Sequence, residues 1–140
     1  MLKGIPKILP PDLLKIMMEM GHGDEIVISD GNFPAASVAK RLVRLDGHDA
    51  MPVLQAMLKL LPLDTYAQPA YIMAKTPGDT VETPIWDEYQ KEISKYSDAK
   101  LEQIERFAFY ERAKEAYAVV YTGESALYAN IILKKGVIAE

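Results

Sequence analysis

The sequence predicts an α/β domain in which a sheet of short strands is flanked by helices. Short runs of β-branched residues alternate along the chain with longer stretches whose apolar residues recur at helical spacing. The length of 140 residues suits one compact domain. No internal repeat or linker divides the chain, so we expect a single domain over residues 1–140.

Four stretches carry apolar residues at the spacing of one helix face. Pro11 can occupy the first position of the first helix, and Gly21 is a natural C-cap for it. Pro62 ends the second helix. The third is amphipathic, with Trp86 and Tyr89 on its apolar side. The expected helices span residues 11–20, 50–61, 84–96 and 109–116.

Five short runs rich in β-branched or apolar residues predict strands, and the first of them ends at an Asp-Gly-Asn turn. Residues 37–46 are ambiguous, because they fit a helix while residues 42–45 also fit a strand. The expected strands span residues 25–29, 71–74, 104–107, 118–121 and 131–133. Short strands that alternate with helices favour a sheet with helices on its faces.

The composition excludes several classes of function. The chain carries 16 basic and 20 acidic residues, a net charge of −4, without a basic stripe. We therefore expect it to bind neither nucleic acid nor an anionic membrane. No apolar run approaches the roughly 18 residues of a membrane span. Residues 10–12 interrupt any signal peptide, so a cytoplasmic location is the default expectation.

Motifs of several enzyme classes are absent. The lack of Cys excludes disulfides, thiolate nucleophiles and Cys-ligated metals. No GxGxxG or P-loop motif indicates a nucleotide cofactor, and there is no HExxH pair or GxSxG elbow. Of the two histidines, His48 is interpreted as a surface residue near the start of the second helix.

Two polar residues flank the first expected strand. His22 lies between two glycines, which leave its imidazole uncrowded, and an imidazole can donate or accept a proton at neutral pH. Taken alone, this segment is explained better as a surface histidine in a capping turn. Asp30 directly follows the strand, where open α/β sheets bind ligands, and its carboxylate can accept two hydroxyl hydrogen bonds. A turn-shaping role explains Asp30 equally well.

Two later segments carry groups suited to a sugar. Residues 106–112 combine aromatic rings, which stack on the apolar face of a sugar, with guanidinium groups that donate to its oxygens. The alternative of core aromatics and surface ion pairs fits Arg112 better than Arg106. Tyr128 and Asn130, between the last two strands, supply donors and acceptors for a neutral hydroxylated ligand, with turn chemistry as the alternative.

Taken in order, these segments resemble the RbsD/FucU family of sugar mutarotases, and within it the L-fucose mutarotase branch. The fucose branch commonly has Tyr-Gly-Asn where this chain has Tyr-Ala-Asn, the form typical of the ribose branch. Phe-Pro-Ala and the run at 106–112 still point to fucose. The resemblance runs nearly end to end and rests on residues 1–3, 21–30, 33–35, 106–112, 122–124 and 128–137.

The resemblance implies an RbsD-like fold and an isomerase that interconverts the α and β anomers of a free monosaccharide, expected to be L-fucose, without metal or cofactor. It implies a cytoplasmic homo-oligomer, commonly a decamer of two pentameric rings. Its catalytic residue falls on His22. Its substrate-binding residues fall on Asp30, Arg106, Tyr128, Ala129 and Asn130.

Mutarotation needs a proton on the ring oxygen and removal of the proton from the anomeric hydroxyl. A positioned acid–base group speeds such transfers about 10²–10⁴-fold. We expect His22 to handle one proton, and Asp30, Tyr128 or a bound water to handle the other. Three alternatives stay open: a D-ribose-type pyranase or mutarotase, a catalytically silent sugar-binding accessory of a transport system, and a structural ring-forming protein.

Overall fold

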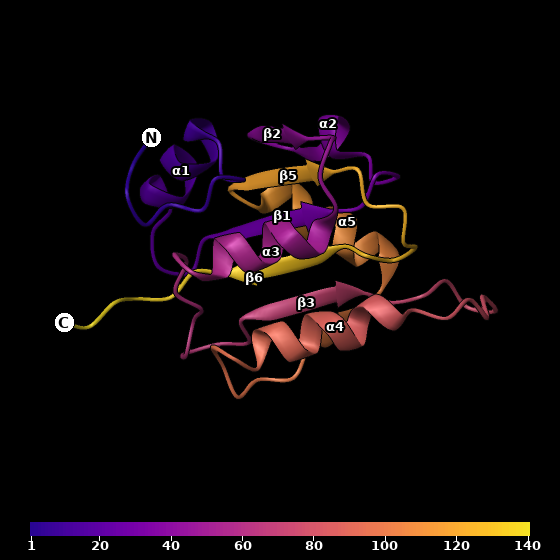
Figure 1. The fold of residues 1–140 in the computed structure, drawn as a ribbon. Coiled ribbons are helices and arrows are strands. Elements are labelled where there is room, and N and C mark those ends of the chain that lie inside the picture. Colours follow the sequence, from indigo (N-terminus) through magenta and orange to yellow (C-terminus); the bar gives the residue numbers. More distant parts are fainter.

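Six short strands lie side by side in one mixed sheet in the computed structural model, which describes residues 1–140 (Figure 1). The strand order is β2-β5-β1-β6-β3-β4, and only β6 runs antiparallel to its neighbours. The other five strands therefore end at one edge of the sheet. The strands are β1 (Glu25–Ser29), β2 (Leu42–Leu45), β3 (Ala70–Met73), β4 (Glu102–Ile104), β5 (Ala118–Thr122) and β6 (Ile131–Lys134).

Helices cover both faces of this sheet (Figure 1). Three of them, α1, α3 and α4, pack on one face, and α2 and α5 pack on the other. The prediction of an α/β fold with a short-stranded sheet flanked by helices is confirmed. The helices are α1 (Pro11–Glu19), α2 (Ala35–Val38), α3 (Ala50–Leu58), α4 (Pro84–Ile93) and α5 (Arg106–Glu115).

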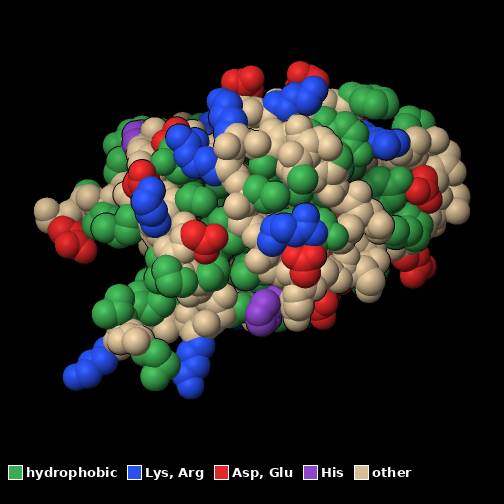
Figure 2. All heavy atoms as spheres, turned by 90° about the horizontal axis from the view of Figure 1, so that it is seen from above, with side chains coloured by type: hydrophobic (Ala, Val, Ile, Leu, Met, Phe, Trp, Pro, Cys, Tyr) green, Lys and Arg blue, Asp and Glu red, His purple; other side chains and the backbone are tan.

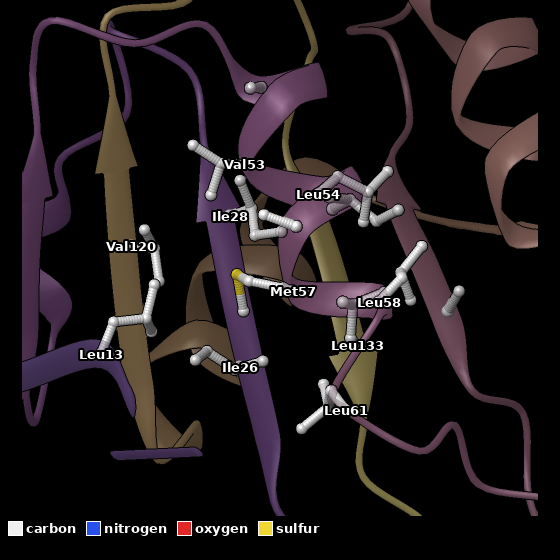
Figure 3. Packing of buried hydrophobic residues seen from close by; sticks show 14 of the residues in the cluster. Leu13, Ile26, Ile28, Val53, Leu54, Met57, Leu58, Leu61, Val120 and Leu133 are labelled. Atoms are coloured by element: carbon white, nitrogen blue, oxygen red, sulfur yellow. The ribbon is translucent and has the colours of Figure 1, made fainter. Parts of the chain in front are cut away.

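The core is divided in two because alternate side chains of a strand point to opposite faces of the sheet. In β1, Ile26 and Ile28 belong to the cluster beneath α3, whereas Val27 belongs to the cluster that contains Phe109 of α5. Figure 3 shows the first cluster, with Met57 of α3 directed at β1. Each fully buried side chain of this size stabilises the fold by roughly 1.5–3 kcal/mol, so both layers of helices are held on the sheet.

The strand expected at residues 104–107 was mostly wrong, because β4 ends at Ile104 and α5 begins at Arg106. Glu105 explains the boundary. Its carboxylate accepts the backbone N–H groups of Phe107 at 2.9 Å and Ala108 at 3.0 Å. This N-cap satisfies two amides that would otherwise be free at the start of the helix.

The expected C-cap at Gly21 was also wrong. The first helix begins at Pro11, as predicted, and ends at Glu19 with Met20 as its cap residue; Gly21 follows the cap but does not adopt the left-handed φ of a capping glycine. The ammonium group of Lys135 donates to the carbonyl oxygens of Met17 at 2.8 Å and Met20 at 2.6 Å. A lysine from the end of the chain therefore satisfies the last carbonyls of this helix.

Other boundaries shifted less. The ambiguous stretch forms β2 at residues 42–45, preceded by the short helix α2. The helix expected to run to residue 61 ends at Leu58, and the one expected to run to residue 96 ends at Ile93. In both cases the chain continues as hydrogen-bonded turns, since Leu61 N–H donates to Met57 O at 2.8 Å and Ser97 N–H donates to Ile93 O at 3.0 Å.

The surface carries mixed charge. On the face drawn in Figure 2, Lys and Arg side chains are interspersed with Asp and Glu, and no continuous basic area forms. That face therefore lacks the basic footprint of a nucleic-acid-binding surface. None of the helices combines the length and apolar character required to cross a membrane.

Two loops meet tightly at the end of β5, where Gly123 has no room for a side chain. A Cβ at this position would overlap the carbonyl oxygen of Asp46 in the turn after β2. The backbone N–H of Gly123 also donates to the carbonyl oxygen of His48 at 2.9 Å. The two backbones are thus in direct contact.

We predict that Gly123→Ala lowers the free energy of unfolding by about 1–3 kcal/mol, because the added methyl group forces the two backbones apart. Gly47→Ala is the matched control in the same turn, since a Cβ there meets no atom within 4 Å. Its stability should be unchanged or slightly raised, because alanine restricts the unfolded chain. Urea unfolding of both variants measures the difference, and equal stabilities would contradict the contact.

Candidate active site

Polar side chains gather at the sheet edge where β1, β3 and β4 end and β6 begins. Asp30 follows β1, Asn130 precedes β6, and Arg106 begins α5 shortly after β4. These three residues line a cavity of about 330 Å³. A cavity of this volume at the carboxyl ends of strands is a typical small-molecule site of α/β proteins.

Asp30 is the buried acceptor of the cavity, with 4% of its surface exposed. Its carboxylate accepts the N–H of Asn32 at 3.0 Å and the side-chain amide of Asn130 at 3.3 Å. The side-chain oxygen of Asn130 accepts the backbone N–H of Asp30 at 2.8 Å. Burial raises the pKa of Asp30, while bonds from Asn32, Ala129, Phe33 and Asn130 oppose that rise.

The segment that precedes β6 is held from behind by α4. The indole N–H of Trp86 donates to the carbonyl oxygen of Tyr128 at 2.8 Å, and the hydroxyl of Tyr89 donates to that of Ala129 at 2.7 Å. Tyr128 lines the cavity with a left-handed φ of 56°, which is uncommon for a residue with a side chain. Ala129 is fully buried in the core, so it contributes backbone alone.

Arg106 and Tyr110, one turn apart on α5, line one side of the cavity with groups that can donate hydrogen bonds, and we call this pair the donor wall. The Nε of Arg106 donates to the hydroxyl oxygen of Tyr110 at 3.0 Å. Because that oxygen accepts from the guanidinium group, the hydroxyl keeps its own proton for a ligand. The ring of Tyr110 lies 5.6 Å from that of Phe33. Phe33, Met73 and Leu127 add an apolar part to the lining.

His22 does not line this cavity. His22 precedes β1, whereas Asp30 follows β1. The two residues therefore lie at opposite ends of a five-residue strand about 16 Å long. The Nε2 of His22 lies 3.0 Å from Oδ1 of Asp64, and the His22 ring lies 5.3 Å from that of Tyr66. Because a carboxylate only accepts, Nε2 carries the proton and Nδ1 is left free.

The buried carboxylate of Asp64 fixes the orientation of the His22 imidazole. Its side chain is 3% exposed, whereas that of His22 is 43% exposed. The backbone N–H of Tyr66 donates to Asp64 at 3.1 Å, and this bond together with the one from His22 holds the pKa of Asp64 below its ordinary value. The pair thus presents an oriented imidazole at the edge of the sheet opposite the cavity.

The structure therefore assembles the predicted site only in part. It brings Asp30, Arg106, Tyr128 and Asn130 to one cavity, but the length of β1 separates His22 from them. His48 is exposed, as expected. No group of three or more His, Asp or Glu side chains is arranged to bind a metal ion.

Several lining residues escaped the sequence analysis. Tyr110 lay within the run that was singled out, and its i, i+4 spacing from Arg106 was the available signal. Thr76 and Asp79 also line the cavity, but their segment carries only the Pro-Gly-Asp composition of an ordinary turn. Asp64, which lies outside the cavity beside His22, also escaped the sequence analysis, because its partner is 42 positions away along the chain and no local pattern marks it.

Comparison with known proteins places these features in a family. The model of the RbsD / FucU transport protein family matches residues 3–138. A fucose mutarotase of Danio rerio is 51% identical over 98% of this chain and 94% of its own length.

Two solved structures extend the comparison. The fucose mutarotase of Streptococcus pneumoniae, in complex with L-fucose, has a TM-score of 0.93 and 48% identity, covering 99% of this chain and 100% of its own. Bacillus subtilis RbsD complexed with D-ribose has a TM-score of 0.71 and 26% identity, covering 94% and 95%. The chain is more similar to the first of these proteins in both sequence and fold.

We predict that Asp30→Asn changes how stability depends on pH. Burial raises the pKa of Asp30 in the folded protein above the ordinary 3.8 of the unfolded chain. At pH values between 3.8 and the raised pKa, the folded protein therefore binds more protons than the unfolded chain. The contribution of Asp30 to stability therefore falls as pH rises through that window, and the variant lacks this fall. Urea unfolding from about pH 4 to about pH 8 should show the variant gaining relative to wild type as pH rises. Parallel curves would contradict the assignment.

Proposed function

This chain belongs to the RbsD / FucU transport protein family, and we propose that it is an L-fucose mutarotase, an isomerase that interconverts the α and β anomers of free L-fucose. The observation that carries the proposal is the cavity in which a buried acceptor, Asp30, faces the same space as the donor wall of Arg106 and Tyr110. The fucose mutarotases among its relatives support the choice of sugar.

The lining suits a neutral monosaccharide. The Asp30 carboxylate can accept sugar hydroxyls, and the guanidinium group of Arg106 can donate to sugar oxygens. The side-chain oxygen of Asn130 accepts from Asp30, and one of its side-chain N–H groups donates to Asp30. The second N–H is left for the ligand. The apolar residues Phe33 and Met73 suit the methyl group of a 6-deoxy sugar, which favours L-fucose over D-ribose.

We assign the first proton transfer to His22 of a neighbouring copy of the chain. A proton moves between groups within about 3 Å of each other or through one bridging water, and β1, about 16 Å long, keeps His22 beyond both reaches of the cavity of its own chain. The Nδ1 of the half-exposed His22 side chain takes the proton of the anomeric hydroxyl, and the electrons of that O–H bond form the carbonyl as the bond from the anomeric carbon to the ring oxygen breaks.

We assign the second transfer to Asp30. Burial raises the pKa of Asp30, which favours the protonated form that this transfer needs, and in that form the second carboxyl oxygen can still accept a sugar hydroxyl. That proton goes to the ring oxygen, which gains an electron pair as the ring opens. Rotation about the bond to the carbonyl carbon and the reverse transfers close the ring on the other face, so both groups are regenerated without a net change.

The same geometry supports a homo-oligomer, for which we propose the decamer of two pentameric rings typical of the family. Large apolar side chains are exposed at both parts of the site. Phe107 is 66% and Leu127 49% exposed near the cavity, and Tyr66 is 78% exposed beside His22. A neighbouring copy that seats His22 at the cavity would cover these groups. A cytoplasmic location completes the proposal.

We predict that His22→Ala reduces anomer exchange of L-fucose about 10²–10⁴-fold, because an acid–base group is lost. His48→Ala is the matched control, since His48 is exposed and lies outside the cavity. Saturation-transfer NMR measures the exchange, and near-normal exchange in His22→Ala would remove His22 from the mechanism. A wild type that binds fucose without speeding exchange beyond buffer would support the silent accessory instead.

The sharing of a site between two copies has its own test. His22→Ala lacks the acid–base group and Arg106→Ala lacks part of the cavity, so each alone should be inactive. Co-expression of the two variants should restore part of the exchange, because a cavity from one chain can pair with the imidazole from another. No recovery in mixed assemblies would contradict the shared site.

We predict that native mass spectrometry shows an oligomer, with the decamer as the expected species. A monomer at micromolar concentration would contradict the assembly.

Titration calorimetry with L-fucose, D-ribose and galactose then separates the remaining alternatives. Tightest binding of D-ribose would favour the ribose-type enzyme, and failure of every sugar to bind would favour a structural ring.

A further inference from the structure

The loop between β3 and α4, residues 74–83, belongs to the cavity although the proposed reaction gives it no role. It is the long excursion between these two elements in Figure 1, and it supplies Thr76 and Asp79 to the lining. The loop is braced internally: Asp79 N–H donates to Thr76 O at 2.9 Å, and Val81 N–H donates to Oδ1 of Asp79 at 3.0 Å. Asp79 therefore has a defined position.

This loop holds the hydroxyl group of Tyr128 from two sides. The hydroxyl donates to Oδ2 of Asp79 at 2.6 Å, and it accepts the backbone N–H of Thr76 at 3.2 Å. A phenol oxygen has one proton and two lone pairs. The proton and one lone pair are thus taken by the loop, and a single lone pair is left for a ligand.

The rest of Tyr128 is equally constrained. Its backbone is left-handed, and the indole of Trp86 fixes its carbonyl group. The side chain is therefore held at its backbone by α4 and at its hydroxyl by the loop. Tyr110 contrasts with it, since the hydroxyl of Tyr110 accepts from Arg106 and keeps its proton. Toward a ligand, Tyr110 can therefore donate a hydrogen bond, whereas Tyr128 can only accept one.

We propose that Asp79 is a positioning and specificity-determining residue, which holds the Tyr128 hydroxyl as a hydrogen-bond acceptor and so selects a sugar with a hydroxyl group at the facing position. The inference rests on the proposed function, because it assumes a monosaccharide in the cavity. A sugar that lacks this hydroxyl leaves the Tyr128 lone pair unpaired in the complex. Without Asp79, the Tyr128 hydroxyl can donate as well as accept, so a group that accepts but cannot donate is also tolerated at the facing position.

The test combines Asp79→Ala, Tyr128→Phe and the double variant, with the dissociation constant of L-fucose measured by titration calorimetry. Each single change should weaken binding about tenfold, the usual effect of one lost hydrogen bond. Because Asp79 acts through Tyr128, the double variant should bind no more weakly than Tyr128→Phe. Asp79→Asn keeps an acceptor for the phenol proton and should retain most of the affinity. Glu82→Ala, an exposed charge in the same loop, is the control expected to bind as the wild type does.

A second measurement reports selectivity, which a merely structural role would not alter. The 2-, 3- and 4-deoxyfluoro analogues of L-fucose, whose fluorine can accept but cannot donate, are compared, and the wild type should reject one of them about tenfold or more. That rejection should disappear in Asp79→Ala. The proposal is overturned if Asp79→Ala binds and selects as the wild type does, or if the losses in the double variant multiply. A wild type that binds no monosaccharide overturns the proposed function and this inference together, whereas unchanged variants of a fucose-binding wild type overturn this inference alone.

Discussion

The pair of hydrogen bonds between Asp30 and Asn130 is the interaction on which the cavity depends. It joins the end of β1 to the start of β6 across 100 positions of sequence. A buried carboxylate without partners would be costly, and Asn130 offsets that cost from the neighbouring strand. The same asparagine places Tyr128 two residues earlier, and α4 then holds that segment from behind. The Asp30 carboxylate, the Tyr128 phenol and the pairing of β1 with β6 are therefore held in place by one connected set of contacts.

The second constraint is the length of β1. A strand about 16 Å long separates an oriented His22–Asp64 pair from the cavity. Side-chain rotation covers only a few ångströms, so no rotamer of His22 reaches a ligand at Asp30 in the same chain. The half-exposed imidazole is nevertheless held by a buried carboxylate. An orientation of this kind has a chemical use only if another molecule meets it, which ties the proposed chemistry to the proposed assembly.

The sequence predicted the features that depend on local pattern. Apolar periodicity located the major helices, and the position of Asp30 after a β-branched run placed it at the ligand-binding edge of the sheet. The misassigned features depend on contacts far apart in the chain. Gly21 suggested a local cap, but Lys135 supplies it from the far end. Asp79 has the pattern of an ordinary turn residue, and only its bond to Tyr128, 49 positions away, brings it into the cavity. Periodicity and motif spacing carry no signal for such pairs.

The arrangement around Tyr128 shows what a protein must supply for a reaction as easy as ring opening. The chemical demand is modest, because both steps are proton transfers between oxygen and a weak acid or base. Orientation then matters more than acid strength, since a sugar ring carries several similar hydroxyl groups that can compete for each donor and acceptor. A phenol whose proton is committed to Asp79 accepts only one kind of partner. The left-handed backbone at Tyr128, uncommon for a residue with a side chain, is held by the indole of Trp86, which donates to the Tyr128 carbonyl oxygen.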